Sequence, residues 1–202
     1  MPSRIVGVDE VGRGALAGPI IAAAVELNEQ LSEKFSDSKK ITALKRQQLA
    51  KLIMTNCNYA IGLVGVEQIN QIGINNANKL AIVNAVEALG FKPDLVFVDG
   101  NLKFSEQNYC SIIKGDAFMP HISAASIVSK VYRDELMVRL SEKFSLYDWH
   151  LNKGYGTAKH CASIINYGAS PQHRTLFLRK ILHFPAKNID ADGLSMANKH
   201  HC

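Results

Sequence analysis

The sequence predicts an α/β domain in which helices flank a small sheet. Five short apolar runs have the length and composition of strands, and segments with helical periodicity lie between and after them. At 202 residues the chain suits one domain, and its hydrophobic fraction of 47% is ordinary for a globular protein with a sizeable core. No apolar run reaches the roughly 18 residues that a membrane-spanning helix needs, so we expect no membrane association.

The first predicted strand covers residues 5–8 and is followed by Asp9, Glu10 and a glycine-rich turn. A second apolar run, 19–27, lies close enough along the chain to pair with the first as a hairpin. The run that starts at residue 94 shows no alternation, as expected of a strand buried on both faces. The last three strands are predicted over residues 59–66, 94–100 and 109–113.

Several helices are expected between and after these strands. Thr42 is the predicted N-cap of the first. A short helical turn over 67–72 is broken by Gly73, and the next helix is expected to end with Gly90 as its C-cap. The longer helices that follow are predicted over residues 75–89, 120–140 and 158–167.

Carboxylates follow three of the predicted strands, as Asp9–Glu10, Asp99 and Asp116. Buried carboxylates are costly unless a cation or hydrogen-bond donors compensate them. Hard cations take oxygen ligands, and no His or Cys accompanies this set, so the residues indicate Mg²⁺ or Mn²⁺ and not zinc. Two such ions about 3.5–4 Å apart would orient a water and stabilise a leaving oxygen in phosphodiester hydrolysis.

Two points about the first carboxylate pair depend on the backbone. Neighbouring residues on a regular strand face opposite ways. Both side chains can therefore reach one site only if the strand ends or bulges at Glu10, which we expect because Gly12 and Gly14 follow. The alternative for Asp9 and Glu10 is a solvent-exposed strand end before a charged turn.

Candidate phosphate contacts lie on the long predicted helix and in one loop. Ser126 and Lys130 are i,i+4 neighbours that could clamp a phosphate, or could be a helix cap and a surface lysine. The segment 37–40, Asp-Ser-Lys-Lys, could likewise contact phosphate or only be solvated. Arg133 and Asp134 are expected to be ordinary surface residues.

The basic charge is concentrated in the C-terminal quarter. Residues 151–202 hold seven Lys or Arg and two Asp, which accounts for the whole net charge of +5. This excess suggests a polyanion held near the carboxylates, although a solvated basic surface would have the same composition. Tyr155 lies here between Gly154 and Gly156, and its ring could stack on a sugar or base, or pack locally in a turn.

The spacing of the cysteines and the composition of the N-terminal residues indicate the cellular compartment of the protein. The four cysteines are far apart and none has CxxC spacing, so neither a zinc site nor a disulfide framework is indicated. The first residues carry no apolar segment of the kind that directs export. We therefore expect a protein of the reducing cytoplasm.

Taken together, six motifs in order resemble ribonuclease HII, over about residues 5–177. The motifs are D-E-x-G-R-G at 9–14, D-S-K-K at 37–40, V-D-G at 98–100, K-G-D at 114–116, S-A-A-S-I-V-S-K at 123–130 and K-G-Y-G-T at 153–157. The resemblance implies a ribonuclease-H-like fold, with a central mixed five-stranded sheet flanked by helices and a helical C-terminal extension. It places a catalytic core at 1–145 and a helical part that completes the substrate groove at 146–187. Residues 188–202 are polar and lack apolar periodicity, so we expect a flexible tail there.

The resemblance also implies an activity. The family cuts the RNA strand of RNA–DNA hybrids and nicks duplex DNA 5′ of a single embedded ribonucleotide, leaving 3′-hydroxyl and 5′-phosphate ends. It implies Mg²⁺ or Mn²⁺ as cofactor, two ions being held with substrate, and a monomer. The family's catalytic and metal-binding carboxylates fall on Asp9, Glu10, Asp99 and Asp116.

The substrate contacts of the family can be carried over in the same way. The backbone of its Gly-Arg-Gly turn surrounds the ribose 2′-hydroxyl, and its tyrosine senses the RNA–DNA junction. In this sequence the substrate-binding residues are Gly12, Arg13, Gly14, Ser38, Lys39, Ser126, Lys130 and Tyr155. Gly156 departs from the family, because many members have proline there, and this could loosen the Tyr155 loop.

Two other classes of protein can be set against this interpretation. One is a nucleic-acid-binding module without catalysis, but no carboxylate is missing to support it. The other is a metal-dependent phosphatase for small phosphoesters. A small substrate would not need the basic C-terminal segment or the Tyr155 loop.

Overall fold

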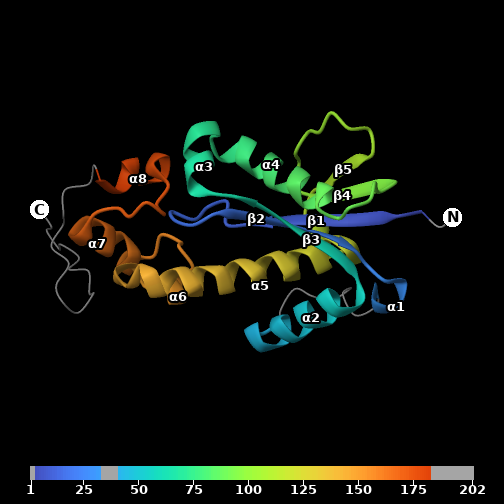
Figure 1. The fold of residues 1–202 in the computed structure, drawn as a ribbon, viewed down its shortest axis with the longest axis horizontal. Coiled ribbons are helices and arrows are strands. Elements are labelled where there is room, and N and C mark those ends of the chain that lie inside the picture. The colour runs from blue at the N-terminus through green and yellow to red at the C-terminus, as the bar shows by residue number, and fades with distance from the viewer. Residues whose placement is uncertain (1–2, 33–40, 183–202) are drawn as a thin grey trace, which may run out of the picture.

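A mixed five-stranded sheet with strand order β3-β2-β1-β4-β5 forms the centre of the computed structural model, which describes residues 3–32 and 41–182 (Figure 1). β1 pairs antiparallel with β2 and parallel with β4, while β2–β3 is antiparallel and β4–β5 parallel. All five predicted strands are confirmed. They are β1 (Ile5–Val11), β2 (Ile20–Glu26), β3 (Asn58–Val64), β4 (Leu95–Asp99) and β5 (Tyr109–Ile112).

Helices cover both faces of this sheet. α3 and α4 lie on one face, and α2 and the long α5 lie on the other (Figure 1). The helices are α1 (Glu29–Ser32), α2 (Ala43–Asn56), α3 (Val66–Ile72), α4 (Ile74–Glu87), α5 (Pro120–Lys143), α6 (Trp149–Asn152), α7 (Ala158–Tyr167) and α8 (Thr175–Leu182), with 3-10 turns η3 (Gly115–Ala117) and η4 (Ser145–Tyr147).

The predicted helix boundaries hold with one exception. Thr42 caps α2 as expected, since its Oγ1 accepts a hydrogen bond from the Lys45 N–H at 3.3 Å. The prediction that Gly90 caps α4 is wrong, because the helix ends at Glu87 and Ala88 is its C-cap. Gly90 has φ +74° and turns the chain two residues later.

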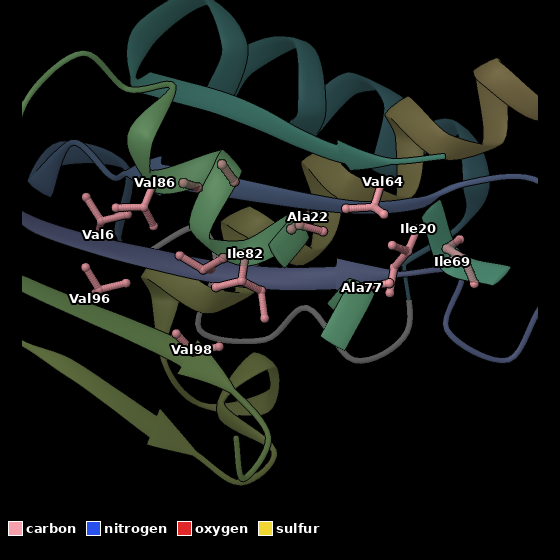
Figure 2. Close-up of a cluster of buried hydrophobic side chains, with 14 residues drawn as sticks. Val6, Ile20, Ala22, Val64, Ile69, Ala77, Ile82, Val86, Val96 and Val98 are labelled. Atoms are coloured by element: carbon pink, nitrogen blue, oxygen red, sulfur yellow. The ribbon is translucent and has the colours of Figure 1, made fainter. Parts of the chain in front are cut away.

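Each face of the sheet has its own hydrophobic core. Val6 and Val8 of β1 pack toward α4 in the first core (Figure 2). On the opposite face, Gly7 lets α5 approach so closely that an added Cβ would lie 2.2 Å from the His121 carbonyl carbon. Gly62 does the same for α4, where a Cβ would lie 2.0 Å from the Ala81 oxygen. Both helices are thus held directly against the strands.

The C-terminal helices build a third core at the far end of α5. Trp149 is fully buried there and stacks on Tyr147 at a centroid distance of 5.3 Å. The other buried residues of this core are Ala17, Met137, Ile164 and Leu178. In the part of the chain that the structure describes, no helix is both long and apolar enough to cross a membrane.

Candidate active site

The first strand does not end or bulge at Glu10. β1 pairs with β2 in unbroken register through Asp9 with Ala23 and Glu10 with Ala22, and ends only at Val11. The expected change of backbone direction is therefore wrong. The pairing with Ala22 and Ala23 of β2 continues past the two carboxylates, and the sequence of β1 alone does not reveal this register.

Asp9 and Glu10 accordingly project from opposite faces of the sheet. Asp9 shares the face of Gly7 and interacts with the Ser126 hydroxyl on α5. Glu10 shares the face of Val6 and Val8 and lies toward Asn78 on α4. Neighbouring residues of a regular strand must alternate in this way, so the two carboxylates can meet only around the edge of β1.

The strand pairing supplies such an edge. The parallel ladder between β1 and β4 stops at Val8 and Val98, while β1 continues. Asp99, the last residue of β4, follows directly, and its negative charge contributes to raising the pKa of both Asp9 and Glu10. The pairing therefore brings the carboxylates of both faces into one coupled group.

Asp116 completes this group from the other side. Its backbone N–H donates to Asp99 Oδ1 at 3.4 Å, and its charge raises the pKa of Asp99, although burial is the larger cause. The residue lies in η3, just beyond β5, and is exposed. The four predicted acidic residues thus lie together at one edge of the sheet.

Burial dominates the electrostatics of the site. Asp9 is only 8% exposed, and desolvation, with smaller contributions from the charges of Glu10 and Asp99, raises its pKa to about 8. Desolvation also raises the pKa of Glu10, against the charge of Arg13, which lowers it. These carboxylates are buried close to one another without enough positive charge nearby to stabilise their ionised forms.

The donor set fits hard divalent cations. None of the ion pairs formed among the described residues involves one of these four carboxylates. Carboxylate oxygens are the ligands that Mg²⁺ and Mn²⁺ prefer, and such an ion would supply the missing charge. Within residues 3–32 and 41–182, however, no three acidic, His or Cys side chains are already close enough together to hold an ion.

The glycine–arginine–glycine turn follows β1 directly. Gly12 is buried with φ +93°, a conformation that glycine adopts at little cost. Arg13 is exposed and donates from Nη2 to the Asn75 side-chain oxygen at 2.9 Å, while Gly14 is exposed with open space beside it. The turn therefore presents accessible backbone next to Glu10.

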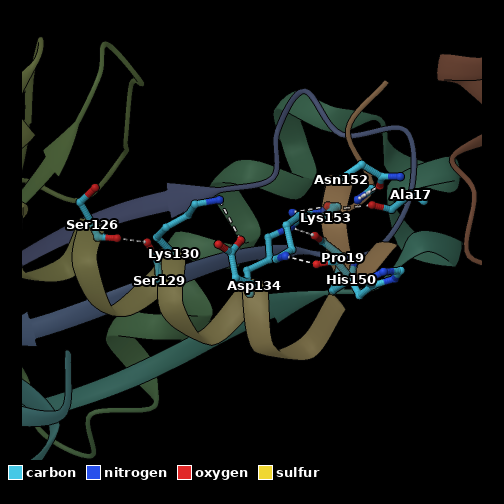
Figure 3. A network of polar contacts seen from close by, with 11 residues as sticks. Ala17, Pro19, Ser126, Ser129, Lys130, Asp134, His150, Asn152 and Lys153 are labelled. Carbon is cyan, nitrogen blue, oxygen red and sulfur yellow. Dashed lines mark hydrogen bonds and ion pairs between the residues drawn. The ribbon is translucent and has the colours of Figure 1, made fainter. Parts of the chain in front are cut away.

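A cleft of about 320 Å³ runs along α5 from these carboxylates. Lys130 lines it and forms an ion pair with Asp134 at 2.7 Å (Figure 3). Ser126 interacts with Asp9. The sequence did not identify Arg46, a cleft residue from α2. The residues that line the cleft are Glu10, Val11, Ile41, Arg46, Asp116, Ser123, Ser126, Ile127, Ser129 and Lys130. Ser38 and Lys39 lie outside the described residues.

Tyr155 lies in the loop between α6 and α7 and is half-buried. Two cations face its ring, with Lys130 Nζ at 5.8 Å and Arg133 Cζ at 5.4 Å from the ring centroid. The loop lies beside the segment that follows the glycine turn, because Leu16 and Ala17 both donate to the Gly154 carbonyl. Tyr155 is thus close to the turn and to the cleft lysine.

Three buried polar residues around the site were not predicted. Arg133, expected on the surface, is 0% exposed, because the helical periodicity of α5 turns it toward the loops and not toward solvent. Arg174 is also fully buried. Asn78 is fully buried, and its amide faces the carboxylate of Glu10. The burial of these three polar side chains depends on tertiary contacts and is not visible in the sequence.

Comparison with known proteins gives a consistent result. A family model described as ribonuclease HII matches residues 6–180. A protein from Rickettsia bellii named ribonuclease HII is 44% identical over 178 residues, which cover 88% of this chain and 91% of that protein.

Solved structures share the fold. Ribonuclease H2 from Pyrococcus horikoshii aligns with a TM-score of 0.73 and 26% identity, covering 88% of this chain and 96% of that one. Bst-RNase HIII in complex with Mn²⁺ aligns with a TM-score of 0.66 and 20% identity, covering 87% of this chain and 64% of that one. At that identity the second likeness concerns the fold alone.

Proposed function

Because the chain belongs to the ribonuclease HII family and is thereby a type 2 ribonuclease H, we propose that it nicks duplex DNA 5′ of single embedded ribonucleotides, as well as hydrolysing the RNA strand of RNA–DNA hybrids. The products would carry 3′-hydroxyl and 5′-phosphate ends. The observation that carries this proposal is the coupled group of Asp9, Glu10, Asp99 and Asp116 beside the Gly12–Gly14 turn.

The carboxylates would hold two Mg²⁺ or Mn²⁺ ions with substrate. Bound there, the ions would orient the attacking water and stabilise the charge that develops on the leaving oxygen. Asp9 and Glu10 would contribute from opposite faces of β1, and Asp99 from the end of β4. The Mn²⁺ complex of Bst-RNase HIII, a protein of the same fold, supports a divalent ion in this family of folds.

Recognition of the ribonucleotide is assigned to the turn. The 2′-hydroxyl is the group that distinguishes RNA from DNA. The open backbone of Gly14 and the positive φ of Gly12 would let peptide groups approach that hydroxyl closely. Arg13, held by Asn75, would place positive charge beside the adjacent phosphate.

Recognition of the following deoxyribonucleotide is assigned to Tyr155. Its ring would stack on a sugar that lacks the 2′-hydroxyl, while Lys130 and Arg46 bind backbone phosphates along the cleft. Ser126 would act mainly on Asp9, and Ser38 and Lys39 would add phosphate contacts. The spread of these cations along the cleft supports a duplex as the substrate.

We also propose that the protein acts as a monomer in the cytoplasm. All four carboxylates, the turn and the Tyr155 loop come from one chain, so the site needs no second copy. Cys57, Cys110 and Cys161 are free thiols, as suits a reducing compartment.

One assay tests the proposed reaction. A DNA duplex with one ribonucleotide is incubated with the protein and Mg²⁺ or Mn²⁺, and the products are resolved at nucleotide resolution. A single nick on the 5′ side of the ribonucleotide is expected. If the protein binds the duplex without cutting it, the protein is a nucleic-acid-binding module. If it does not bind the duplex but hydrolyses small phosphoesters, it is a phosphatase.

A further inference from the structure

The buried Arg133 is a cation without an anionic partner among the described residues. Its side chain forms no ion pair there, although Asp134 is its neighbour in the chain and pairs instead with Lys130. A buried guanidinium is costly unless its donors are all satisfied. Desolvation accordingly lowers the pKa of Arg133. A residue retained at this cost needs a structural or functional reason.

Three hydrogen bonds join its side chain to backbone carbonyls of two separate segments. Nε donates to the Pro19 oxygen at 3.0 Å and Nη2 to the Ala17 oxygen at 3.1 Å. Nη1 donates to the Lys153 oxygen at 2.9 Å. Ala17 and Pro19 follow the glycine turn and Lys153 begins the Tyr155 loop (Figure 3), so one side chain of α5 bridges both segments.

The side chain also contacts the two proposed substrate elements directly. An added Cβ on Gly12 would lie 2.2 Å from Arg133 Nε, so the turn rests against the guanidinium. The ring of Tyr155 lies over its Cζ at 5.4 Å. Lys153 has φ +51°, a left-handed conformation that costs about 1 kcal/mol outside glycine and needs support from its surroundings.

We propose that Arg133 is a positioning residue that fixes the Gly12–Gly14 turn to the Tyr155 loop, so that the contact to the 2′-hydroxyl and the contact to the next sugar keep a constant spacing. This inference rests on the proposed function of the turn and of Tyr155. Its consequence is that Arg133 sets the preference for a ribonucleotide followed by DNA without touching the substrate.

Arg174 provides a contrast within the same region. It donates twice to the Gly18 oxygen, at 3.0 and 2.8 Å, and once to the Arg13 oxygen at 3.1 Å. All three bonds go to the segment around the turn. The side-chain hydrogen bonds of Arg174 therefore reach only the segment around the turn, whereas those of Arg133 join that segment to the Tyr155 loop.

The test compares Arg133→Lys with wild type on two substrates of equal length, a DNA duplex with one ribonucleotide and a uniform RNA–DNA hybrid. Lysine keeps the charge but cannot reach three carbonyls at once. We expect the ratio of the two cleavage rates to fall about tenfold, as loss of one to two charge-assisted hydrogen bonds would produce. Arg139→Lys, the same change at an exposed position of α5, should leave the ratio unchanged.

A double variant separates positioning from general damage. Arg133→Lys combined with Tyr155→Ala should lower the ratio no further than Tyr155→Ala alone, because both act through one element. If both rates fall equally in Arg133→Lys, or if the two substitutions lower the ratio independently, the proposal is overturned.

Amide hydrogen exchange tests the link made by Arg133 independently of the cleavage reaction. The amides of Leu16 and Ala17 donate to Gly154 across the junction of the two segments, and they should exchange faster in Arg133→Lys than in wild type, at unchanged exchange of β1. Unchanged exchange at both amides would refute the link even if the wild-type enzyme cut embedded ribonucleotides. Faster exchange in an enzyme that does not cut them would refute the proposed function and retain the link.

Discussion

The Nε2 atoms of His160 and His173 lie 3.1 Å apart in the interior of the C-terminal part, where both rings are buried. The Trp149 indole N–H donates to His160 Nε2, and the Ser170 backbone N–H donates to His173 Nδ1. These donors leave His160 protonated on Nδ1, which donates to the Tyr155 carbonyl, and His173 protonated on Nε2. Burial lowers the pKa of both rings, so both are neutral at neutral pH.

We expect the protein to lose stability as the pH falls from about 6.5 to about 4. Burial, and then the charge of His160, lower the pKa of His173 to about 4, against about 6.5 in an unfolded chain. Between these values the unfolded chain binds more protons, so acidification lowers the free energy of unfolding, by about 2 kcal/mol from pH 7 to 4.5 for His173 alone. Urea denaturation at several pH values measures this.

His173→Asn is the control for that prediction. Asparagine can still accept from the Ser170 N–H in place of Nδ1, but its shorter side chain does not reach His160 and does not titrate. The variant should be less stable at pH 7 and should show a shallower decline below pH 6.5. Parallel declines in both proteins would contradict the assignment.

Asp9→Asn should stabilise the metal-free protein while it abolishes cleavage. The carboxylate is buried, and the charges of Glu10 and Asp99 oppose its ionisation. With a pKa of about 8, Asp9 must take up a proton or keep an unfavourable charge in the folded protein at neutral pH, whereas a neutral amide needs neither and should raise the free energy of unfolding by about 1 kcal/mol. Thermal melts in a chelator, together with the cleavage assay, measure both effects.

The exposed Asp116 gives the matched control for Asp9. Asp116→Asn should also abolish cleavage, but it should leave the melting temperature of the metal-free protein nearly unchanged, because solvent already screens its charge. Full activity in either variant would remove that residue from the proposed metal site.

Tyr155→Ala should reduce cutting at a single ribonucleotide in DNA about tenfold, since ring stacking on a nucleotide contributes about 1–3 kcal/mol. Cutting of a uniform RNA–DNA hybrid should change less. Tyr155→Phe keeps the ring and should behave as wild type, because no hydrogen bond of the Tyr155 hydroxyl is formed among the described residues. Equal losses on both substrates would count against junction sensing.

Gly156→Pro should leave stability nearly unchanged, because proline restricts the unfolded chain while an added Cβ would lie 3.0 Å from Leu16 Cδ1 in the folded protein. Gly156 has no positive φ, and its backbone N–H makes no backbone hydrogen bond among the described residues. Gly154→Pro should instead destabilise the protein, because Gly154 has φ +81° and an added Cβ would lie 2.5 Å from the Ala17 oxygen. Chemical denaturation of both variants measures the contrast.

The regular elements of the fold follow from local sequence. Apolar runs located all five strands, and Thr42 located the start of α2. The short helix α6 and the terminal α8 were not predicted, because their stability comes from tertiary contacts such as the burial of Trp149 and Leu178. The register that carries β1 past Asp9 depends on the partner strand β2 and could not be derived from β1.

The sequence was sufficient to predict which residues form the site, but not how their side chains are arranged. Carboxylates after apolar runs are visible in the sequence, whereas the adjacency of β1 and β4, which places Asp99 beside Asp9, is a property of the topology. Arg133 looked like a surface residue because its helix is largely polar around it, and only the loops that pack on α5 explain its burial.

Because Asp9 and Glu10 project from opposite faces of the sheet, activity depends on the packing of the helices on both faces. One carboxylate is held by the layer that contains α5 and the other by the layer that contains α4. Detachment of either layer would displace one ligand and leave the other in place. We therefore expect no active intermediate during unfolding, and loss of catalysis should coincide with the first loosening of either helix layer, ahead of the melting of the sheet.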